Sequence, residues 1–177
     1  MIPAAMKLSD LHLVLQTIFE WTNSHLHAFE YDGMWLEPEL PGEPKSRENE
    51  LYEKWTVGDV LEEVNDQLIY MYDFGDDWTH SIKLENILRV SELPHGADTE
   101  LPLCIGGKRP GPLEDCGGPP GLDHMLKALN DPKHPEYEEY QEWAGGYEDE
   151  EFDIEITNEM LQSENFGAID WSDNDLF

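Results

Sequence analysis

The apolar positions near the N-terminus predict a helix. Between residues 8 and 22 they recur at intervals of about 3.6 residues, as Leu8, Leu11, Leu15, Ile18, Phe19 and Trp21. This period gives a helix a single apolar face that can pack on a core. Ser9 or Asp10 is in position to cap the first turn.

Two pairs of alternating segments predict β-hairpins. Residues 25–31 alternate in polarity, Asp32-Gly33 is a favoured two-residue turn, and the chain returns through residues 34–36. Residues 68–73 and 78–88 form the second pair, joined by residues 74–77. On the longer strand one face carries Trp78, His80, Ile82 and Leu84.

The remaining pattern predicts short helices around loops. Expected helices are 57–64, capped by Thr56, then 119–130, 135–143 and 157–161, whereas the Pro- and Glu-rich residues 37–50 are expected to form a loop. The fold class is therefore α+β, with an antiparallel sheet built from two hairpins and covered by helices. We expect a single domain over residues 1–162, which fits the total length of 177 residues.

The C-terminal residues 163–177 differ in composition from the domain. From His134 to the C-terminus there are 15 Asp or Glu residues and no Lys or Arg, and the last residues include Phe166, Trp171 and Phe177. Such a segment cannot form a core of its own. Composition leaves open whether its aromatic rings dock on the domain or the acidic tail stays disordered and attracts a basic partner.

The net charge restricts the partners. Forty acidic and ten basic residues give −30 at pH 7, a field that repels phosphate backbones and disfavours non-specific nucleic-acid binding. The charge fits a basic protein partner, bound cations, or adaptation to a salty cytoplasm. No apolar run approaches the ~20 residues that span a bilayer, and no signal pattern opens the chain, so a cytoplasmic location without membrane contact is expected. Two cysteines do not make a disulfide framework.

Two stretches carry more polar groups and special backbone positions than core building requires. Residues 70–80 place three Asp, a Trp and a His around one tight turn, and residues 103–121 use six Gly and four Pro to hold two Cys, a Glu and an Asp. We expect the turn at 73–80 and the loop at 104–121 to face each other as a recognition surface. Its candidate binding residues are Asp73, Asp76, Asp77, Trp78, His80, Glu114 and Asp115. Among these, Asp115 is the carboxylate expected to hold the loop by bonding nearby backbone N–H groups.

Two metal hypotheses use these stretches. Zinc accepts nitrogen, sulfur and oxygen ligands, which makes candidates of His25, His27, His80, Cys104 and Cys116. Alternatively, Mg²⁺ or Mn²⁺ could be held by the carboxylates of the turn and loop, with His80 as acid or base of a hydrolase. Neither a Cys-x-x-Cys pair nor a His-Glu-x-x-His motif is present. The competing interpretation is that the histidines are half-buried strand residues and the cysteines small hydrophobic ones.

Four motifs in one order give the chain a resemblance to a known family. They are Trp21-Thr-Asn-Ser-His-Leu-His-Ala-Phe29, Tyr72-Asp-Phe-Gly-Asp-Asp-Trp-Thr-His80, Cys104-Ile-Gly-Gly with Glu114-Asp-Cys-Gly-Gly-Pro119, and Asp131-Pro-Lys-His-Pro-Glu136 followed by Trp143. The chain resembles the plasmid Ri open-reading-frame-three-like family over residues 8–160. This resemblance implies a prokaryotic α+β protein carried near mobile elements, without an established activity. A second label of the family refers to a transposon resolvase, but no serine-recombinase motif or basic DNA-binding helix is found here.

The chain differs from the family pattern before its first helix. Family members usually carry an additional strand before the first helix, whereas only residues 1–7 precede it here. Either the chain begins late, or a sheet edge is open and invites a homodimer through strand pairing. Taken together, these observations favour an acidic accessory or binding protein, and a metal-dependent hydrolase or nuclease is the alternative.

Overall fold

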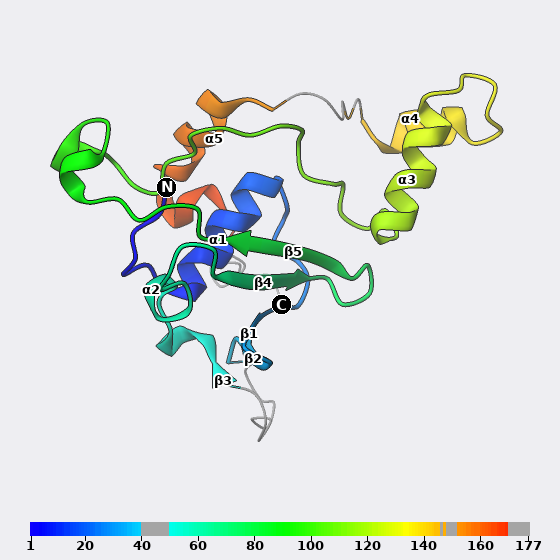
Figure 1. Ribbon diagram of the computed structural model, residues 1–177. Helices are drawn as coiled ribbons and strands as arrows, with labels where there is room; N and C mark the ends of the chain where they lie inside the picture. Colours follow the sequence, from blue (N-terminus) through cyan, green and yellow to red (C-terminus); the bar gives the residue numbers. More distant parts are fainter. Residues whose placement is uncertain (40–49, 146, 148–151, 170–177) are drawn as a thin grey trace.

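A five-stranded mixed sheet forms the centre of the protein (Figure 1). The computed structural model describes residues 1–39, 50–145, 147 and 152–169. The strand order is β3-β2-β1-β4-β5, with β1 His27–Tyr31, β2 Met34–Glu37, β3 Glu50–Leu51, β4 Gln67–Tyr72 and β5 Trp78–Lys83. The predicted α+β class and both hairpins are confirmed.

The two hairpins join through their first strands. β1 pairs antiparallel with β4, so that His27 lies opposite Tyr72 and Phe29 opposite Tyr70. β3 adds a short parallel strand beside β2, which the alternating pattern did not predict. Most of the expected loop at residues 37–50 lies outside the described residues, and β5 ends at Lys83 instead of residue 88.

Apart from the strands, the elements of the described residues are α-helices and 3-10 helices. The α-helices are α1 Leu8–Phe19, α2 Val57–Val60, α3 Gly118–Leu129, α4 Tyr137–Trp143 and α5 Ile154–Leu161. The 3-10 helices are η1 Tyr52–Lys54, η2 Val90–Glu92, η3 Gly96–Asp98 and η4 Glu164–Gly167. The predicted side-chain cap of α1 is wrong, because Lys7 is its N-cap and no side chain bonds there. α2 is a single turn, closed by the predicted capping box between Thr56 and Asp59.

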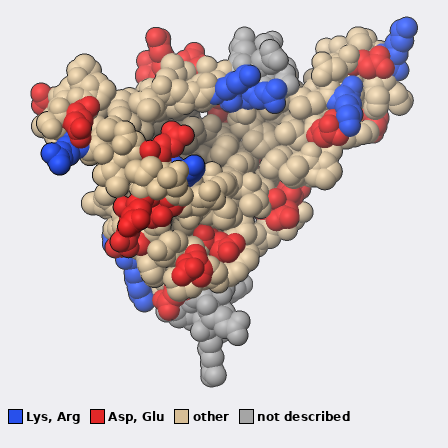
Figure 2. Space-filling model, viewed as in Figure 1, with Lys and Arg blue, Asp and Glu red and all other residues tan. Residues whose placement is uncertain are grey.

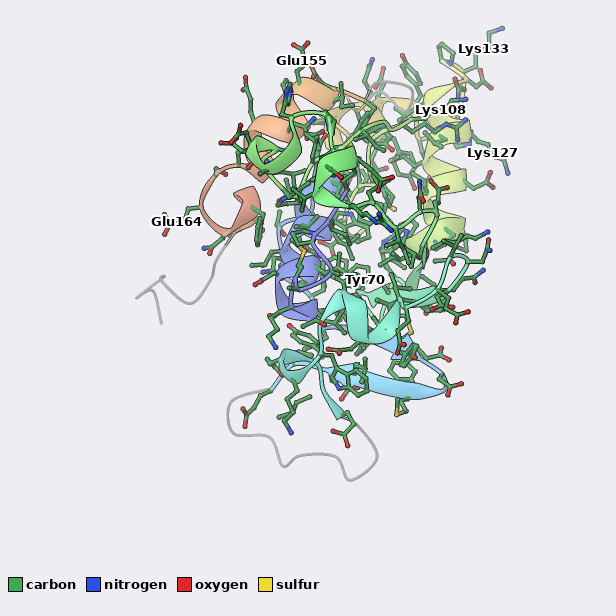
Figure 3. All side chains as sticks on the ribbon, turned by 60° about the vertical axis from the view of Figure 1, so that its left-hand side comes forward. Tyr70, Lys108, Lys127, Lys133, Glu155 and Glu164 are labelled. Atoms are coloured by element: carbon green, nitrogen blue, oxygen red, sulfur yellow. The ribbon has the colours of Figure 1, made fainter. Side chains whose placement is uncertain are left out.

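The core lies between α1 and the aromatic face of the sheet. Tyr70 and Tyr72 of β4 are fully buried there, as is Phe29 of β1, and Tyr70 lies in the interior in Figure 3. The alternation predicted for β4 and β5 therefore places Trp78 and His80 on the same face, opposite Tyr72 and Tyr70.

A polar network crosses this core. Gln16 Nε2 donates to the Tyr70 hydroxyl at 2.9 Å, and that hydroxyl lies 2.8 Å from His12 Nδ1. Since the hydroxyl accepts from Gln16, its proton is free to donate to His12 Nδ1, which leaves His12 Nε2–H to donate to Asn23 Oδ1 at 2.8 Å. His12 stacks on His27 with ring centroids 3.4 Å apart. Burial lowers the pKa of His12 to about 4, against a smaller upward effect of the Asn23 bond, so His12 is neutral at pH 7.

The described part of the tail lies against α1. Thr17 Oγ1 donates to the carbonyl of Phe166 at 2.7 Å, and Asn23 Nδ2 donates to that of Ile169 at 3.1 Å. The Phe166 side chain is partly buried against the core. Trp171 and Phe177, which the sequence also singled out, lie outside the described residues.

α3 and α4 form a pair that projects from the sheet at the end where β4 turns into β5 (Figure 1). The long segment after β5 crosses the molecule before reaching α3. Figure 2 shows acidic side chains spread over the visible face and basic ones confined to a few places. Among the described residues, no helix has the length and apolar character needed to cross a membrane.

Candidate functional site

The Gly/Pro loop and the β4–β5 turn lie in direct contact. Asp76 Oδ2 accepts a 3.0 Å hydrogen bond from the backbone N–H of Gly117. At Gly118, which has a φ of +66°, an added Cβ would lie 2.1 Å from the carbonyl oxygen of Asp76. Only glycine fits this position, because both the left-handed backbone and the close approach exclude a side chain. The glycines of the loop thus allow the two stretches to touch.

Glu114 ties the loop to β4 and to the end of α1. Its Oε1 accepts from the Tyr72 hydroxyl at 2.5 Å, and its Oε2 accepts from the backbone N–H of Thr22 at 2.9 Å. The same hydroxyl accepts from the N–H of Ser24 at 3.1 Å. Burial raises the pKa of Tyr72, and the bond to Glu114 and its negative charge raise it further. Within the loop, the carboxylate that forms these hydrogen bonds is therefore Glu114 and not the predicted Asp115, whose described contact is with His25.

An aromatic wall supports this contact. Trp21 stacks on Tyr72 with centroids 4.5 Å apart, and its Nε1 donates to the carbonyl of Pro112 at 2.7 Å. Trp78 is buried in the core beside Trp21, and the centroids of their rings are 6.3 Å apart. His80 lies against Phe19 and Trp21, with centroid distances of 4.3 and 5.5 Å. Burial lowers the pKa of His80, which keeps its imidazole neutral.

A second histidine lies on the outer side of this wall. His25 has its Nδ1 3.6 Å from Asp73 Oδ2 and its Nε2 3.4 Å from Asp115 Oδ1. One nitrogen of His25 and one oxygen from each Asp all lie within 4.8 Å of one another. This is the one group of three or more candidate metal ligands among the described residues. It combines one residue from the predicted zinc set with two from the predicted carboxylate set.

The other predicted metal ligands lie in different surroundings. His27 is buried, stacks on His12, and has its Nε2 3.0 Å from the Tyr52 hydroxyl. Both cysteines are free. The backbone of Cys104 is bonded to the Asn158 side chain of α5, while Cys116 follows Asp115 in the loop. Burial raises the pKa of Cys116, so it is a neutral thiol at pH 7.

Asp77 belongs to the turn but not to the group formed by His25, Asp73 and Asp115. Its backbone N–H donates to the carbonyl of Asp73 at 2.6 Å, and its φ of +57° is one that Asp tolerates better than most residues. Asp73 Oδ1 accepts from the N–H of Gly75 at 2.9 Å and closes the turn. The three aspartates of the turn therefore have separate tasks: Asp73 faces His25, Asp76 holds the loop, and Asp77 shapes the backbone.

A groove opens between the loop and α4. Its volume is about 470 Å³, and it is lined by Asp115, Cys116, Glu139, Tyr140, Glu142 and Trp143. Trp143 is 47% exposed. Three acidic residues and two aromatic residues thus line the same groove, a composition suited to a cation that carries a planar or extended side chain.

A larger hollow lies between η3 and α5. It has a volume of about 750 Å³ and is lined by residues that include His95, Asp98, Glu100, Glu155 and Glu159. Its lining is acidic too, but it holds no Trp, Tyr or Phe among its lining residues. From the turn at 73–80 and the stretch at 103–121, only Leu103 is among its lining residues.

Sequence reasoning did not include α4 in the site. The pattern predicted a helix at residues 135–143 but placed none of the candidate binding or metal residues on it. Trp143 belongs to the fourth motif, after Asp131–Glu136, and this was the one signal that linked α4 to the other motifs. Tyr72 and Thr22 were missed as partners of Glu114 because no local pattern shows which segments meet.

Comparison with known proteins identifies relatives that match most of this chain. Residues 1–158 match the family described as plasmid pRiA4b ORF-3-like protein. The uncharacterized protein y4hQ of Sinorhizobium fredii is 35% identical over 155 residues, which cover 81% of this chain and 71% of that protein. The crystal structure of MM3350, a protein of unknown function from Methanosarcina mazei Go1, superposes with a TM-score of 0.67 at 33% identity, over 88% of this chain and 85% of that one.

Proposed function

Because the chain belongs to the plasmid pRiA4b ORF-3-like family, whose relatives named above have no stated function, we propose a function from the site itself. The protein is an accessory binding protein that recognises a positively charged segment of a partner protein. The segment lies in the groove between the loop and α4. The observation that carries this proposal is that Asp115, Glu139 and Glu142 line the same groove as Tyr140 and Trp143.

The chemistry of the groove favours arginine or lysine side chains. A guanidinium or ammonium group over an indole ring gains about 0.5–2 kcal/mol, and Trp is the strongest partner for it. Asp115, Glu139 and Glu142 supply the opposite charge at the rim. Each exposed ion pair adds at most about 1 kcal/mol, so selectivity for cations comes from several weak contacts together.

The charge of the whole chain supports the same partner. A net charge of −30 accelerates the encounter with a basic segment and repels nucleic acid. The groove also has a rigid wall, because Glu114 and Asp76 fix the loop on which Asp115 stands. A wall that is ordered before binding reduces the entropic cost of recognition.

The test is binding of a synthetic peptide of alternating arginine and glycine, measured by fluorescence anisotropy in EDTA. We expect saturable binding that weakens as salt increases, and no binding of the glutamine–glycine counterpart. Trp143→Ala should weaken binding roughly threefold to tenfold, a factor corresponding to the loss of one cation–π contact. Glu139→Gln should weaken it less.

Matched controls are available elsewhere on the surface. Trp35 of β2 is 40% exposed and lies outside the groove, so Trp35→Ala should bind as the wild type does. Glu138→Gln changes the same charge as Glu139→Gln on the same helix, but outside the groove lining. Equal losses in the groove and control variants would show a purely global charge effect and would refute the groove.

The alternative function is a metal-dependent hydrolase. The observation that favours it is the grouping of His25, Asp73 and Asp115. A nuclease is the least suitable form of this alternative, since a net charge of −30 opposes the approach of a polyanion.

A further inference from the structure

We propose that His25, Asp73 and Asp115 form a binding site for one divalent transition-metal ion of the Zn²⁺ type. The inference rests on the geometry of these three side chains and is independent of the proposed partner recognition, although Asp115 belongs to both sites.

The first observation concerns the unsatisfied nitrogen of His25. Its Nε2 is out of contact with solvent and has no hydrogen-bond partner within the described part of the chain. A polar atom in this state costs free energy unless something binds it. Asp115 Oδ1 lies 3.4 Å away, in an arrangement that does not make a hydrogen bond.

This separation suits a shared metal ion. Nitrogen and oxygen ligands lie about 2.0–2.2 Å from Zn²⁺ in a tetrahedral site, which places two ligand atoms roughly 3.4 Å from each other. The observed distance of 3.4 Å between Nε2 and Asp115 Oδ1 agrees with this spacing. An ion between them would satisfy the orphaned nitrogen and neutralise the carboxylate.

Asp73 provides the third ligand. Its carboxylate completes the group whose ligand atoms all lie within 4.8 Å of one another. The Asp73 side chain is only 13% exposed, whereas that of Asp115 is 73% exposed, so the ion would enter from the side of Asp115. Three protein ligands leave a fourth position for water, as in catalytic rather than structural zinc sites.

The scaffold holds the ligands before an ion arrives. The His25 ring packs edge-on against Tyr72, with centroids 5.6 Å apart. Asp73 is fixed through its other oxygen by the N–H of Gly75. The loop that carries Asp115 is bonded to Asp76 through Gly117. Three segments far apart in the sequence thus bring their ligand atoms within 4.8 Å of one another.

The ligand set selects the type of ion. One imidazole and two carboxylates suit Zn²⁺ or Mn²⁺, while Mg²⁺ prefers oxygen ligands alone. The neighbouring Cys116 is not part of the set, because it does not belong to the group of ligand atoms within 4.8 Å of one another, and its Sγ donates to the carbonyl of Gly118 at 3.8 Å. The competing explanation is an ion-free cluster in which a protonated His25 pairs with both carboxylates.

The experiment is a Zn²⁺ titration of metal-free, untagged protein by isothermal calorimetry, followed by Co²⁺ absorption spectroscopy. We expect one ion per chain, much weaker binding of Mg²⁺, and a Co²⁺ spectrum without a thiolate charge-transfer band. His25→Gln, Asp73→Asn and Asp115→Asn should each weaken Zn²⁺ binding at least about tenfold.

The aspartate variants are chosen so that the fold is kept. Asn tolerates the left-handed backbone that Asp73 and Asp115 adopt, at φ of 53° and 58°, and its oxygen can still accept from Gly75. Asp77→Asn is the matched control, since Asp77 has a φ of 57° in the same turn but lies outside the cluster. It should bind Zn²⁺ like the wild type.

Several results would overturn the proposal. They are the absence of saturable Zn²⁺ binding, equal binding by the three ligand variants and the wild type, or a loss of binding that only Cys116→Ser produces. A protonated His25 in the metal-free protein at pH 7, seen by NMR and unchanged by Zn²⁺, would establish the ion-pair explanation instead. Because the peptide assay is run in EDTA, failure of either site leaves the other to be judged on its own data.

Discussion

The hydroxyl of Tyr72 donates a 2.5 Å hydrogen bond to Oε1 of Glu114, across 42 positions of sequence. This bond joins β4 to the loop that carries Asp115. The groove and the group formed by His25, Asp73 and Asp115 both use Asp115, the residue next to Glu114. The strength of this bond can be tested by substitution.

Glu114→Ala should lower the free energy of unfolding by about 1–3 kcal/mol, since it leaves the Tyr72 hydroxyl and the N–H of Thr22 without their acceptor. Asp115→Ala should cost less, because its side chain is 73% exposed. Urea denaturation of the two variants measures the difference. A larger cost for Asp115→Ala would restore the role that the sequence alone gave to Asp115.

Gly118→Ala should destabilise the protein by roughly 2–5 kcal/mol, because the new Cβ would lie 2.1 Å from the carbonyl oxygen of Asp76 in a left-handed backbone. Gly96→Ala is the matched control: its φ is +59°, but nothing lies within 4 Å of the added Cβ. It should cost only about 1–2 kcal/mol. Thermal melting of both variants gives the comparison, and similar losses would show that the turn and loop are not in tight contact.

The sequence predicted the helices and hairpins because these elements depend on local periods. The alternation along residues 78–84 was enough to place Trp78 and His80 on one face of their strand, where they lie opposite Tyr72 and Tyr70. It did not show that His80 would lie against Phe19, which depends on how α1 packs on the sheet, or that His25 would meet Asp115, which depends on the course of the loop. The bias toward Gly and Pro marked residues 103–121 as special, but not which carboxylate would hold the loop. α4 belongs to the site because it lines the groove together with Asp115 and Cys116 of the loop, and this proximity depends on tertiary packing.

Stability should fall as the solution becomes acidic, owing to His12. The folded protein holds this imidazole neutral with a pKa of about 4, whereas in the unfolded chain the pKa is about 6.5. Between these values the unfolded chain binds more protons, so the free energy of unfolding decreases as pH falls. From pH 6.5 to 4.5 the contribution of His12 is about 2 kcal/mol.

Urea denaturation at several pH values measures this dependence. His12→Gln should be less stable at pH 7.5 and should show a shallower slope between pH 6.5 and 4.5. His95→Asn, at an exposed position in the segment after β5, should keep the wild-type slope. An unchanged slope in His12→Gln would mean that the buried histidine does not control acid stability.

Truncation after Gln162 should destabilise the domain by roughly 1–3 kcal/mol. It removes Phe166, whose side chain packs on the core and whose carbonyl accepts from Thr17. Truncation after Ile169 is the control, because it keeps these contacts and the one between Asn23 and Ile169. If both truncated proteins melt like the full chain, the segment 163–169 does not contribute to the core, and the tail is a separate acidic appendage.

The measurement that tests the account most directly is an NMR titration of ¹⁵N-labelled protein with the arginine–glycine peptide in EDTA. The proposed recognition site predicts that the indole Nε1–H of Trp143 shifts with the backbone signals of residues 115–116 and 139–143, while the indole of Trp35 stays in place. Shifts confined to the hollow lined by His95, Asp98, Glu155 and Glu159, or no saturable shift at Trp143, would contradict it.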